Sequence, residues 1–367
     1  MSEKIAKTIC RYGQANGHSH LRLENKEGKL LCFYGPETGA EYLRLDCSEA
    51  ASIAETFRYL VGAVDNELFV DKRFKIADKD GVISGRATLL PASNGEKLLI
   101  TLRNSKPQAR RWGALGLNRD QQKILKSALA KKSGVIIIAS AAENGSSSTY
   151  YSLLQAANNN KSTYSLEAYP GNSLNNTNII NPKKYGGIAA SLDKLISLDS
   201  ELIGVDADLN QNDIKAIWRV AYSGRLIIAV LPALNAAQAL KIIKQSGLST
   251  AAIASQLSLI LAQKLFPRPC SKCLRVFDPG INIKKTIIQR WPIAATAWPK
   301  KLYRNHGCLA CRPQANATAV FEIMRFLPDG RLAAGYQPLI IDALAKAGLG
   351  LINIEDIAAW ADTNKKL

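Results

Sequence analysis

Residues 134–154, GVIIIASAAENGSSSTYYSLL, decide the fold, because an apolar run is followed by small and polar residues and then by a segment compatible with a helix. The run Val135–Ala139 carries no charge, which is typical of a strand buried on both faces of a parallel sheet. The turn from such a strand into a helix lies at the carboxyl edge of the sheet, where ligands bind. We therefore expect the residues after Ala139 to occupy the position of a phosphate-binding loop.

The residues of this turn lack the side chains that phosphate chemistry requires. A phosphate-binding loop uses glycines, a lysine that reaches the outer phosphates, and a following Ser or Thr that holds Mg²⁺. Gly145 is present, but Ser146 stands at the lysine position, and Ser140 and Glu143 stand where glycines are expected. We predict that the scaffold is kept and the chemistry lost. The alternatives are an ordinary strand-to-helix turn and weak nucleotide binding at the helix N-terminus. The residues of the degenerate site would be Gly145, Ser146, Ser147 and Ser148.

The composition is that of a globular protein with an excess of positive charge. Of 367 residues, 47% are hydrophobic and 21% charged, and the formal net charge is +18. No apolar run approaches the length of a membrane span and the N-terminus has no signal-peptide core, so we expect a cytoplasmic protein. The charge favours an acidic partner: nucleic acid, an anionic membrane surface or an acidic protein. A basic solvated surface is an equal alternative, because Lys and Arg are spread along the chain.

The seven cysteines fall into two groups. Cys10, Cys32 and Cys47 are isolated and are interpreted as buried or free thiols of a reduced compartment. The other four form two C-x-x-C pairs with 34 residues between them: Cys270, Cys273, Cys308 and Cys311. Two such pairs can complete a closed tetrahedral zinc site, so we predict structural zinc rather than a disulfide or a redox pair.

The pattern along the chain predicts three folded parts and a linker. An α+β domain with an antiparallel meander over residues 67–104 is followed by a polar linker and then by alternating strands and helices, which indicate a parallel sheet covered on both faces. The predicted segments are 1–104 for the α+β domain, 105–116 for the linker, 117–265 for the parallel-sheet domain and 266–367 for the zinc subdomain with C-terminal helices. In the parallel-sheet domain, the predicted strands include Thr163–Leu166, Leu202–Val205 and Leu226–Leu231, and the predicted helices include Gln211–Ala221, Ala236–Ser246 and Ala251–Leu265.

An ordered series of motifs resembles the ATPases that power type II secretion and type IV pilus assembly. The matching stretches are SHLRLEN (19–25), RATLLPASNGEK (86–97), LGLNRDQQ (115–122), the opening stretch, and AQKLFPRPCSKC (262–273), followed in order by Cys308, Cys311 and Glu322. The resemblance implies a PAS-like N-terminal domain, a RecA-like ATPase domain and a tetracysteine zinc subdomain. It also implies hexameric rings with nucleotide between neighbouring chains.

Residues that act on nucleotide in this family are replaced at several places. The acidic box after the second strand keeps Glu167 and loses the next carboxylate. In the segment that matches the Walker B motif, Ala207 replaces the glutamate that would activate water. Asp206 lies one position earlier, and we expect this shift at a strand end to point its carboxylate another way. The other replacements are Arg225 and Pro232 for the two histidines of the histidine box and Thr101 for the second N-terminal arginine, whereas Arg86 is kept as a nucleotide contact.

We therefore predict a catalytically inactive relative of these ATPases. One charge-stabilising group is commonly worth about 10³-fold or more in phosphoryl transfer, and several are missing here. The expected cofactor is zinc, without ATP or Mg²⁺. The resemblance implies a structural or regulatory subunit at the inner face of the cytoplasmic membrane, in its own ring, in a ring with an active paralogue, or as a monomeric adaptor beside the inner-membrane platform protein. The family's extra N-terminal module, which docks onto that platform, is not expected in this chain.

Two other functions stay open. A divergent ATPase could use Ser146–Thr149 for Mg²⁺ together with a displaced base. A nucleic-acid-binding protein of DNA uptake could use the basic surface, with Trp291, Trp298 and the nearby lysines stacking on bases. We expect these tryptophans instead to form the core of the small zinc subdomain.

Overall fold

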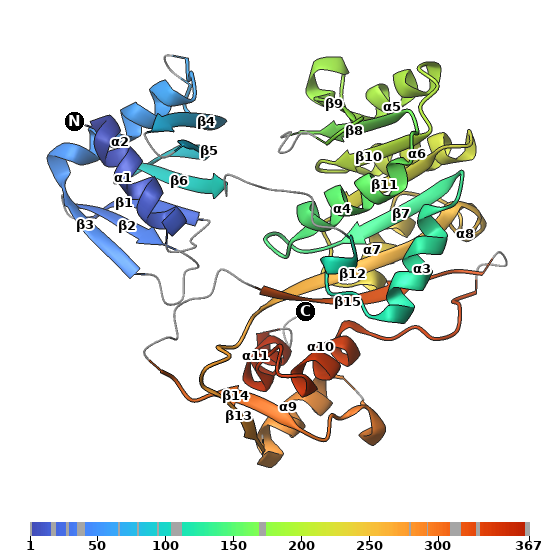
Figure 1. Cartoon of the computed structure of the whole chain (residues 1–367). Coiled ribbons are helices and arrows are strands. Elements are labelled where there is room, and N and C mark those ends of the chain that lie inside the picture. The colour runs from blue at the N-terminus through green and yellow to red at the C-terminus, as the bar shows by residue number, and fades with distance from the viewer. Residues whose placement is uncertain are drawn as a thin grey trace. The chain divides into compact units, whose positions relative to one another are not determined.

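The computed structural model describes residues 2–15, 20–26, 29–34, 41–64, 67–78, 81–93, 95–103, 112–168, 174–278, 280–291, 293–308, 317–327 and 331–363. The chain forms two compact units, Met1–Pro107 and Gln108–Arg312 with Asn316–Leu367 (Figure 1). Each unit is considered by itself below.

The first unit is a six-stranded antiparallel sheet with two helices, in the strand order β3-β2-β1-β6-β5-β4. Its elements are α1 (Ser2–Ala15), β1 (His20–Lys26), β2 (Lys29–Tyr34), β3 (Glu41–Asp46), α2 (Cys47–Leu60), β4 (Val70–Asp78), β5 (Gly81–Ala92) and β6 (Gly95–Arg103). Ile9 of α1, Phe57 of α2 and Phe74 of β4 share one buried core. The predicted meander is confirmed as β4, β5 and β6. Helix α1 was not predicted.

The second unit is built on a seven-stranded sheet in the order β15-β12-β7-β11-β10-β8-β9. The strands are β7 (Gly134–Ala139), β8 (Thr163–Glu167), β9 (Asn178–Ile180), β10 (Leu202–Asp206), β11 (Leu226–Leu231), β12 (Leu257–Pro267) and β15 (Ala317–Met324). All neighbouring pairs are parallel except β12 with β15. The prediction of a parallel sheet at this place in the chain is confirmed.

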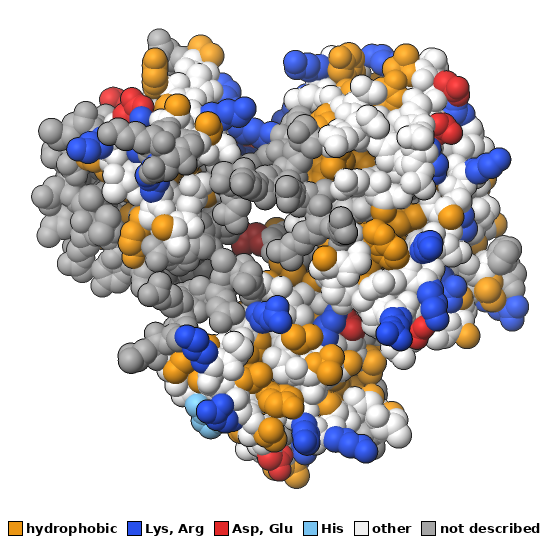
Figure 2. Space-filling view, viewed as in Figure 1, with side chains coloured by type: hydrophobic (Ala, Val, Ile, Leu, Met, Phe, Trp, Pro, Cys, Tyr) orange, Lys and Arg blue, Asp and Glu red, His pale blue; other side chains and the backbone are white. Residues whose placement is uncertain are grey.

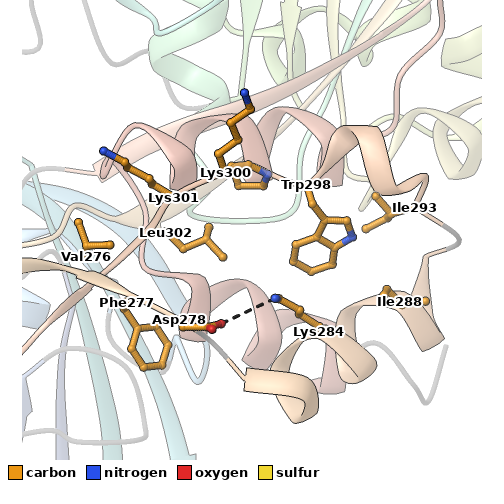
Figure 3. Close-up of a pocket in the computed structure, with 11 residues that line it drawn as sticks. Val276, Phe277, Asp278, Lys284, Ile288, Ile293, Trp298, Lys300, Lys301 and Leu302 are labelled. Atoms are coloured by element: carbon orange, nitrogen blue, oxygen red, sulfur yellow. Dashed lines mark ion pairs between the residues drawn. The ribbon is translucent and has the colours of Figure 1, made fainter.

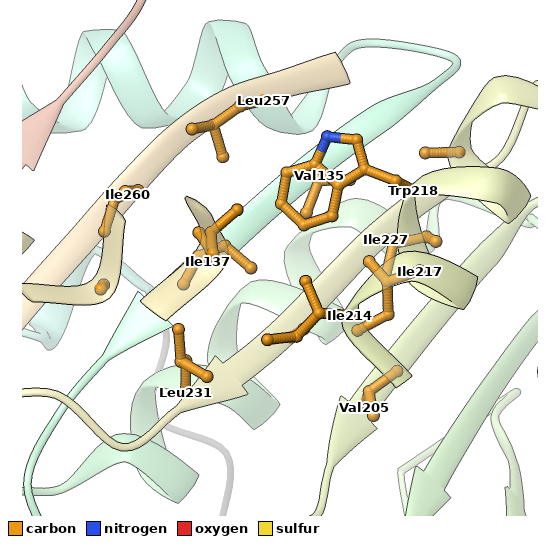
Figure 4. Close-up of a cluster of buried hydrophobic side chains, with 14 of the residues drawn as sticks. Val135, Ile137, Val205, Ile214, Ile217, Trp218, Ile227, Leu231, Leu257 and Ile260 are labelled. Carbon is orange, nitrogen blue, oxygen red and sulfur yellow. The ribbon is translucent and has the colours of Figure 1, made fainter. Parts of the chain in front are cut away.

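Helices cover both faces of this sheet. Successive side chains of β7 point to opposite sides of the sheet, so this strand contributes to a core on each face. Val135 and Ile137 join a core that includes Trp218 (Figure 4), whereas Ile136 and Ile138 join a second core with α3 and α4. The first core packs under α5, α6, α7 and α8. The helix bounds are α3 (Arg119–Leu129), α4 (Ser146–Asn158), α5 (Ile188–Ser197), α6 (Gln211–Tyr222), α7 (Ala236–Gln245) and α8 (Thr250–Gln256), with short 3₁₀ turns η1 (Trp112–Ala114) and η2 (Pro182–Tyr185).

One predicted helix is wrong. The segment Ala251–Leu265 was predicted as a single helix, but it divides into α8 and the long strand β12. Residues 257–262 are all buried in the sheet beside β7. A short apolar run of this kind fits a buried helix or a central strand equally well, and the neighbouring strand decides between them.

The C-terminal part of the second unit surrounds its own core. It contains the hairpin β13 (Leu274–Phe277) and β14 (Leu302–Asn305), helix α9 (Gly280–Arg290), the 3₁₀ turn η3 (Ala295–Ala297), α10 (Leu339–Gly348) and α11 (Ile354–Thr363). Trp291 and Trp298 pack against this core, and the Trp291 ring lies 4.5 Å from that of Trp360. Both tryptophans therefore contribute to packing. Among the residues described, no helix is long and apolar enough to span a bilayer.

A close contact between β10 and α4 explains the glycine in the middle of β10. The side chain of Tyr150 is completely buried, and a Cβ atom added at Gly204 would lie 2.1 Å from its hydroxyl oxygen. A large residue on the helix is thus matched by the smallest residue on the strand. This contact fixes how closely α4, and the loop before it, approach the sheet.

Gly204→Ala should lower the free energy of unfolding by about 1–3 kcal/mol, because an extra methyl group overpacks this contact. Gly113→Ala in η1 is the matched control, since nothing lies within 4 Å of an added Cβ there. It should change stability by less than about 0.5 kcal/mol. Urea denaturation measures both. Adding Tyr150→Leu to Gly204→Ala should recover much of the loss, and equal stability of Gly204→Ala and the control would contradict this account of the contact.

Candidate functional site

The loop between β7 and α4 contains two residues with left-handed backbone. Gly145, directly before α4, has a φ of 80°, and Glu143 has a φ of 65°. Both values lie in the left-handed region, which costs a residue with a Cβ about 1–2 kcal/mol. At Gly145 an added Cβ would also lie 3.2 Å from Leu265 Cδ1. Glu143 therefore adopts a left-handed conformation at a position where glycine is expected.

Hydrogen bonds from β12 hold this loop in place. The carbonyl of Asn144 accepts from Gln263 Nε2, and the side-chain oxygen of Asn144 accepts from the backbone N–H of Leu265 at 3.0 Å. The Asn144 side chain also donates to Ala142 O at 3.0 Å. The shape of the loop is thus fixed by the protein's own groups.

One serine at the start of α4 faces a carboxylate. Ser147 Oγ lies 3.5 Å from Oδ2 of Asp206, the last residue of β10. Gly204 and Asp206 lie on the α4 side of the strand, while Val205 belongs to the opposite core. Our expectation that the Asp206 carboxylate points away from the loop is therefore corrected. Because side chains alternate along β10, Ala207 lies on the other side of the sheet, where it packs against the core that contains Val205.

The electrostatics of the loop disfavour a polyanion. Residues 140–149 contain no Lys or Arg, and their single charged residue is Glu143. A lysine about 4 Å from a phosphate contributes about 4 kcal/mol at an effective dielectric constant of 20. Here Ser146 takes that position, while Glu143 and Asp206 add negative charge nearby. The first-turn N–H groups of α4 and its dipole are the attractive groups for an anion here.

The remaining acidic-box residue is part of a buried hydrogen-bond network. Glu167 at the end of β8 accepts hydrogen bonds from Tyr151 Oη at 2.7 Å and from Ser165 Oγ at 2.6 Å. Tyr150 Oη lies 2.6 Å from the same serine hydroxyl. Burial, and then the charge of Glu167, raise the pKa of Tyr150 well above its usual range. This carboxylate connects α4 to the sheet.

Arg86, the predicted nucleotide contact of the first unit, forms an ion pair with a carboxylate of its own sheet. Its Nε and Nη2 donate to the two carboxylate oxygens of Asp71 on β4. Thr88 Oγ1 donates to Asp71 Oδ1 at 2.9 Å. Thr101, which replaces the second arginine, lies opposite Arg86 in the pairing of β5 with β6. A bidentate pair of this kind neutralises the guanidinium that a phosphate would otherwise use.

Arg225 and Pro232 stand at the two histidine positions of the histidine box. Arg225 Nε donates to Ser200 O at 3.1 Å, and Nη2 donates to Ile196 O at 3.2 Å. These bonds satisfy one carbonyl in the last turn of α5 and one in the segment between α5 and β10. Pro232 is exposed just after β11. Neither residue supplies a proton-transfer group.

Glu322 on β15 connects the N-terminal ends of two helices. It accepts from the backbone N–H groups of Ala236 in α7 and Leu339 in α10, the latter at 2.7 Å, and from Tyr336 Oη at 3.2 Å. Burial raises the pKa of Glu322 despite these bonds. Glu322, a residue of the motif series, therefore serves to cap two helices.

Three of the four predicted metal ligands lie together. The Sγ atoms of Cys270, Cys273 and Cys308 are all within 4.8 Å of one another, and those of Cys270 and Cys308 are 3.9 Å apart. Thiolates bound to one tetrahedral zinc at about 2.3 Å are separated by about 3.8 Å, so the donor set and its spacing fit a metal ion. Cys311, the fourth predicted ligand, lies outside the described residues.

Two other cysteines have a different environment. Cys10 and Cys32 are buried in the core of the first unit. Burial, and then the proximity of Cys32, raise the pKa of Cys10 to about 12. Such a thiol stays protonated and unreactive, as expected of a packing residue. The side chain of Cys47 lies outside the described residues.

The family model described as "Type II/IV secretion system protein" matches residues 61–334. The chain belongs to this family. The match begins directly after α2, extends beyond β15, and includes the loop, Glu322 and the two C-x-x-C pairs.

The curated relatives that match this chain are longer than the chain itself. The type IV pilus assembly ATPase PilB of Acinetobacter baylyi is 25% identical over 310 residues, which cover 78% of the chain and 53% of the relative. The HofB homologue of Escherichia coli, a protein transport protein, is 26% identical over 290 residues, which cover 77% of the chain and 61% of the relative. The chain thus spans little more than half the length of the relatives it matches.

Solved structures share the fold of this family member. The Legionella pneumophila ATPase DotB superimposes with a TM-score of 0.68 at 13% identity, covering 99% of the chain and 96% of DotB. The pilus retraction motor PilT with bound ADP gives a TM-score of 0.56 at 16% identity, covering 73% and 80% of the two chains. At these identities the likeness shows the fold alone.

Sequence reasoning missed several residues that shape the site. Asn144 and Gln263 fix the loop, and Tyr150 with Gly204 sets its distance from the sheet. A tyrosine after the serine run and a glycine inside an apolar strand were the available signals. A glycine in a strand often marks a close approach by another group.

Proposed function

We propose that this chain is a catalytically inactive member of the secretion and pilus-assembly ATPase family. In this proposal it is a cytoplasmic structural or regulatory subunit of a pilus or secretion machine, with the RecA-like fold of the second unit and a PAS-like first unit. The observation that carries the proposal is the absence of Lys and Arg from residues 140–149, where Ser146 stands at the lysine position. In the motif match, Ala207 after β10 stands at the position of the catalytic glutamate. Loss of two such groups is expected to reduce phosphoryl transfer by about 10⁶-fold, if each contributes about 10³-fold.

The partners follow from the same proposal. A subunit that retains the scaffold of a ring ATPase can occupy a ring position without turning over nucleotide. We propose either a homo-hexamer or a mixed ring with an active paralogue, located at the inner face of the cytoplasmic membrane beside a platform protein. The matched relatives named as a pilus assembly ATPase and a protein transport protein support a role in one of these two processes.

A specific contact supports a second candidate function, a divergent ATPase. Ser147 occupies the position of the Mg²⁺-holding residue, and its hydroxyl lies 3.5 Å from the Asp206 carboxylate. A hydroxyl and a carboxylate of this kind hold Mg²⁺ in phosphate-binding loops. The missing lysine and glutamate still argue for the inactive subunit.

Mg·ATP turnover by the purified chain decides between the two. We expect no phosphate release above the background of a Ser147→Ala and an Asp206→Asn preparation, because transition-state charge is not stabilised in the loop. Turnover on the order of one per second, typical of an enzyme, that collapses in both variants would establish the divergent ATPase. Turnover that both variants retain would indicate a contaminating enzyme and leave the inactive assignment standing.

The cysteine cluster is proposed to hold one structural zinc ion through Cys270, Cys273, Cys308 and Cys311. Elemental analysis should find about one zinc per chain, and Cys273→Ser should lose it and lower the melting temperature, since zinc binding contributes to folding. Ser271→Ala, at the exposed position between the first two cysteines, is the control and should keep its zinc. A metal-free wild-type protein, or a disulfide between these cysteines, would contradict the assignment.

A further inference from the structure

A pocket of about 570 Å³ lies in the C-terminal part of the second unit, away from the loop (Figure 3). It is formed by the β13–β14 hairpin, helix α9 and the segment that leads into β14. Its volume is within the range of about 300–1,000 Å³ that is common for ligand pockets. Neither the candidate nucleotide loop nor the cysteine cluster lines it.

The floor and sides of this pocket are apolar. Trp298 occupies the middle of the view in Figure 3, with Leu302 and Phe277 on one side and Ile288 and Ile293 on the other. Leu302 is buried in the core beneath, whereas Ile288 is 44% exposed. A concave apolar surface with exposed aliphatic side chains suits the insertion of a bulky apolar side chain.

The margin of the pocket is positively charged. Three lysines and one aspartate line it, and Lys284 Nζ lies 3.7 Å from the Asp278 carboxylate. Lys300 and Lys301 are exposed and form no ion pair with any residue that the structure describes. In Figure 3, Lys284 lies below Trp298, and Lys300 and Lys301 lie above it and to its left. In the lower part of Figure 2, which holds β13, β14 and α9, hydrophobic side chains are bordered by Lys and Arg.

We propose that this pocket binds a short acidic segment of a partner protein. One bulky apolar side chain of that segment packs against Trp298, and flanking Asp or Glu side chains pair with Lys300 and Lys301. Complementary charge steers such a segment to the site and sets its orientation, while the apolar anchor supplies affinity. The inference does not rest on the proposed function, because the pocket is remote from the loop and needs no nucleotide.

Other occupants fit the pocket less well. Single-stranded nucleic acid is bound by long positive grooves with exposed aromatic faces, whereas this pocket is largely aliphatic and its lining contains no arginine. A membrane surface is met by a convex amphipathic helix with an outward apolar face, whereas this site is hollow. An acidic peptide with one apolar anchor matches both the shape and the charge.

Selection of peptides from a random display library against the immobilised full chain tests the proposal. Selected peptides should be enriched in Asp and Glu around one aromatic or large aliphatic residue. The synthetic consensus peptide, labelled for fluorescence anisotropy, should bind the Lys300→Glu/Lys301→Glu chain at least about tenfold more weakly than wild type. The Lys300→Arg/Lys301→Arg chain should bind it nearly as well as wild type. Trp298→Phe should weaken binding without the loss of folding expected of a truncation.

The matched control reverses a second pair of adjacent exposed lysines in the same unit, Lys183 and Lys184 in η2. Lys183→Glu/Lys184→Glu should leave peptide affinity unchanged. Equal weakening by the two reversals would show a non-specific charge effect and overturn the proposal, as would selected peptides without acidic enrichment. Retention of a single-stranded oligonucleotide or of phosphatidylserine vesicles by wild type, with loss of that retention in the Lys300→Glu/Lys301→Glu chain, would point to a different ligand. If the consensus peptide then bound both chains equally, nucleic acid or lipid would replace the peptide.

Discussion

The burial of β7 between β11 and β12 is the constraint on which the rest of the second unit depends. All six of its residues are buried, it is hydrogen-bonded along both edges, and its two faces supply two separate cores. Removing any part of this strand would leave unpaired backbone groups and a cavity at the same time. The loop that follows is therefore carried to the carboxyl edge of the sheet whatever its own side chains are.

The shape of the loop is supported by groups of the protein itself. Left-handed backbone persists at Glu143 and Gly145, and Asn144 is fixed by β12, so the turn does not need a bound anion for its shape. Two polar residues of the motif series, one in each unit, have structural partners. Glu167 accepts two hydroxyl donors, and Arg86 pairs with Asp71 in the first unit. Both residues thus hold strands or helices of their own unit together.

Much of the fold was predictable because its signals are local. Buried parallel strands appear as continuous apolar runs, and the N-terminal meander appears as alternation with turn residues. Helix α1 was missed although Ala6, Ile9 and Cys10 are buried at helical spacing. Strand β12 was mistaken for a helix, because nothing in its own residues reveals that β7 lies beside it.

The site was predictable in its residue types and less so in its geometry. The sequence shows that the lysine and the glutamate are replaced, but the direction of the Asp206 carboxylate depends on which residues of β10 face α4. The contact of Tyr150 with Gly204 likewise joins residues far apart in the chain. The C-x-x-C spacing, in contrast, identified three cysteines that the structure brings within reach of one ion.

Calorimetric titration of ATP, with and without Mg²⁺, into the purified chain tests most directly whether the loop is a scaffold without its chemistry. The account predicts no saturable binding tighter than about 1 mM, which corresponds to about −4 kcal/mol. Micromolar binding that requires Mg²⁺ and is lost in Ser147→Ala would contradict it.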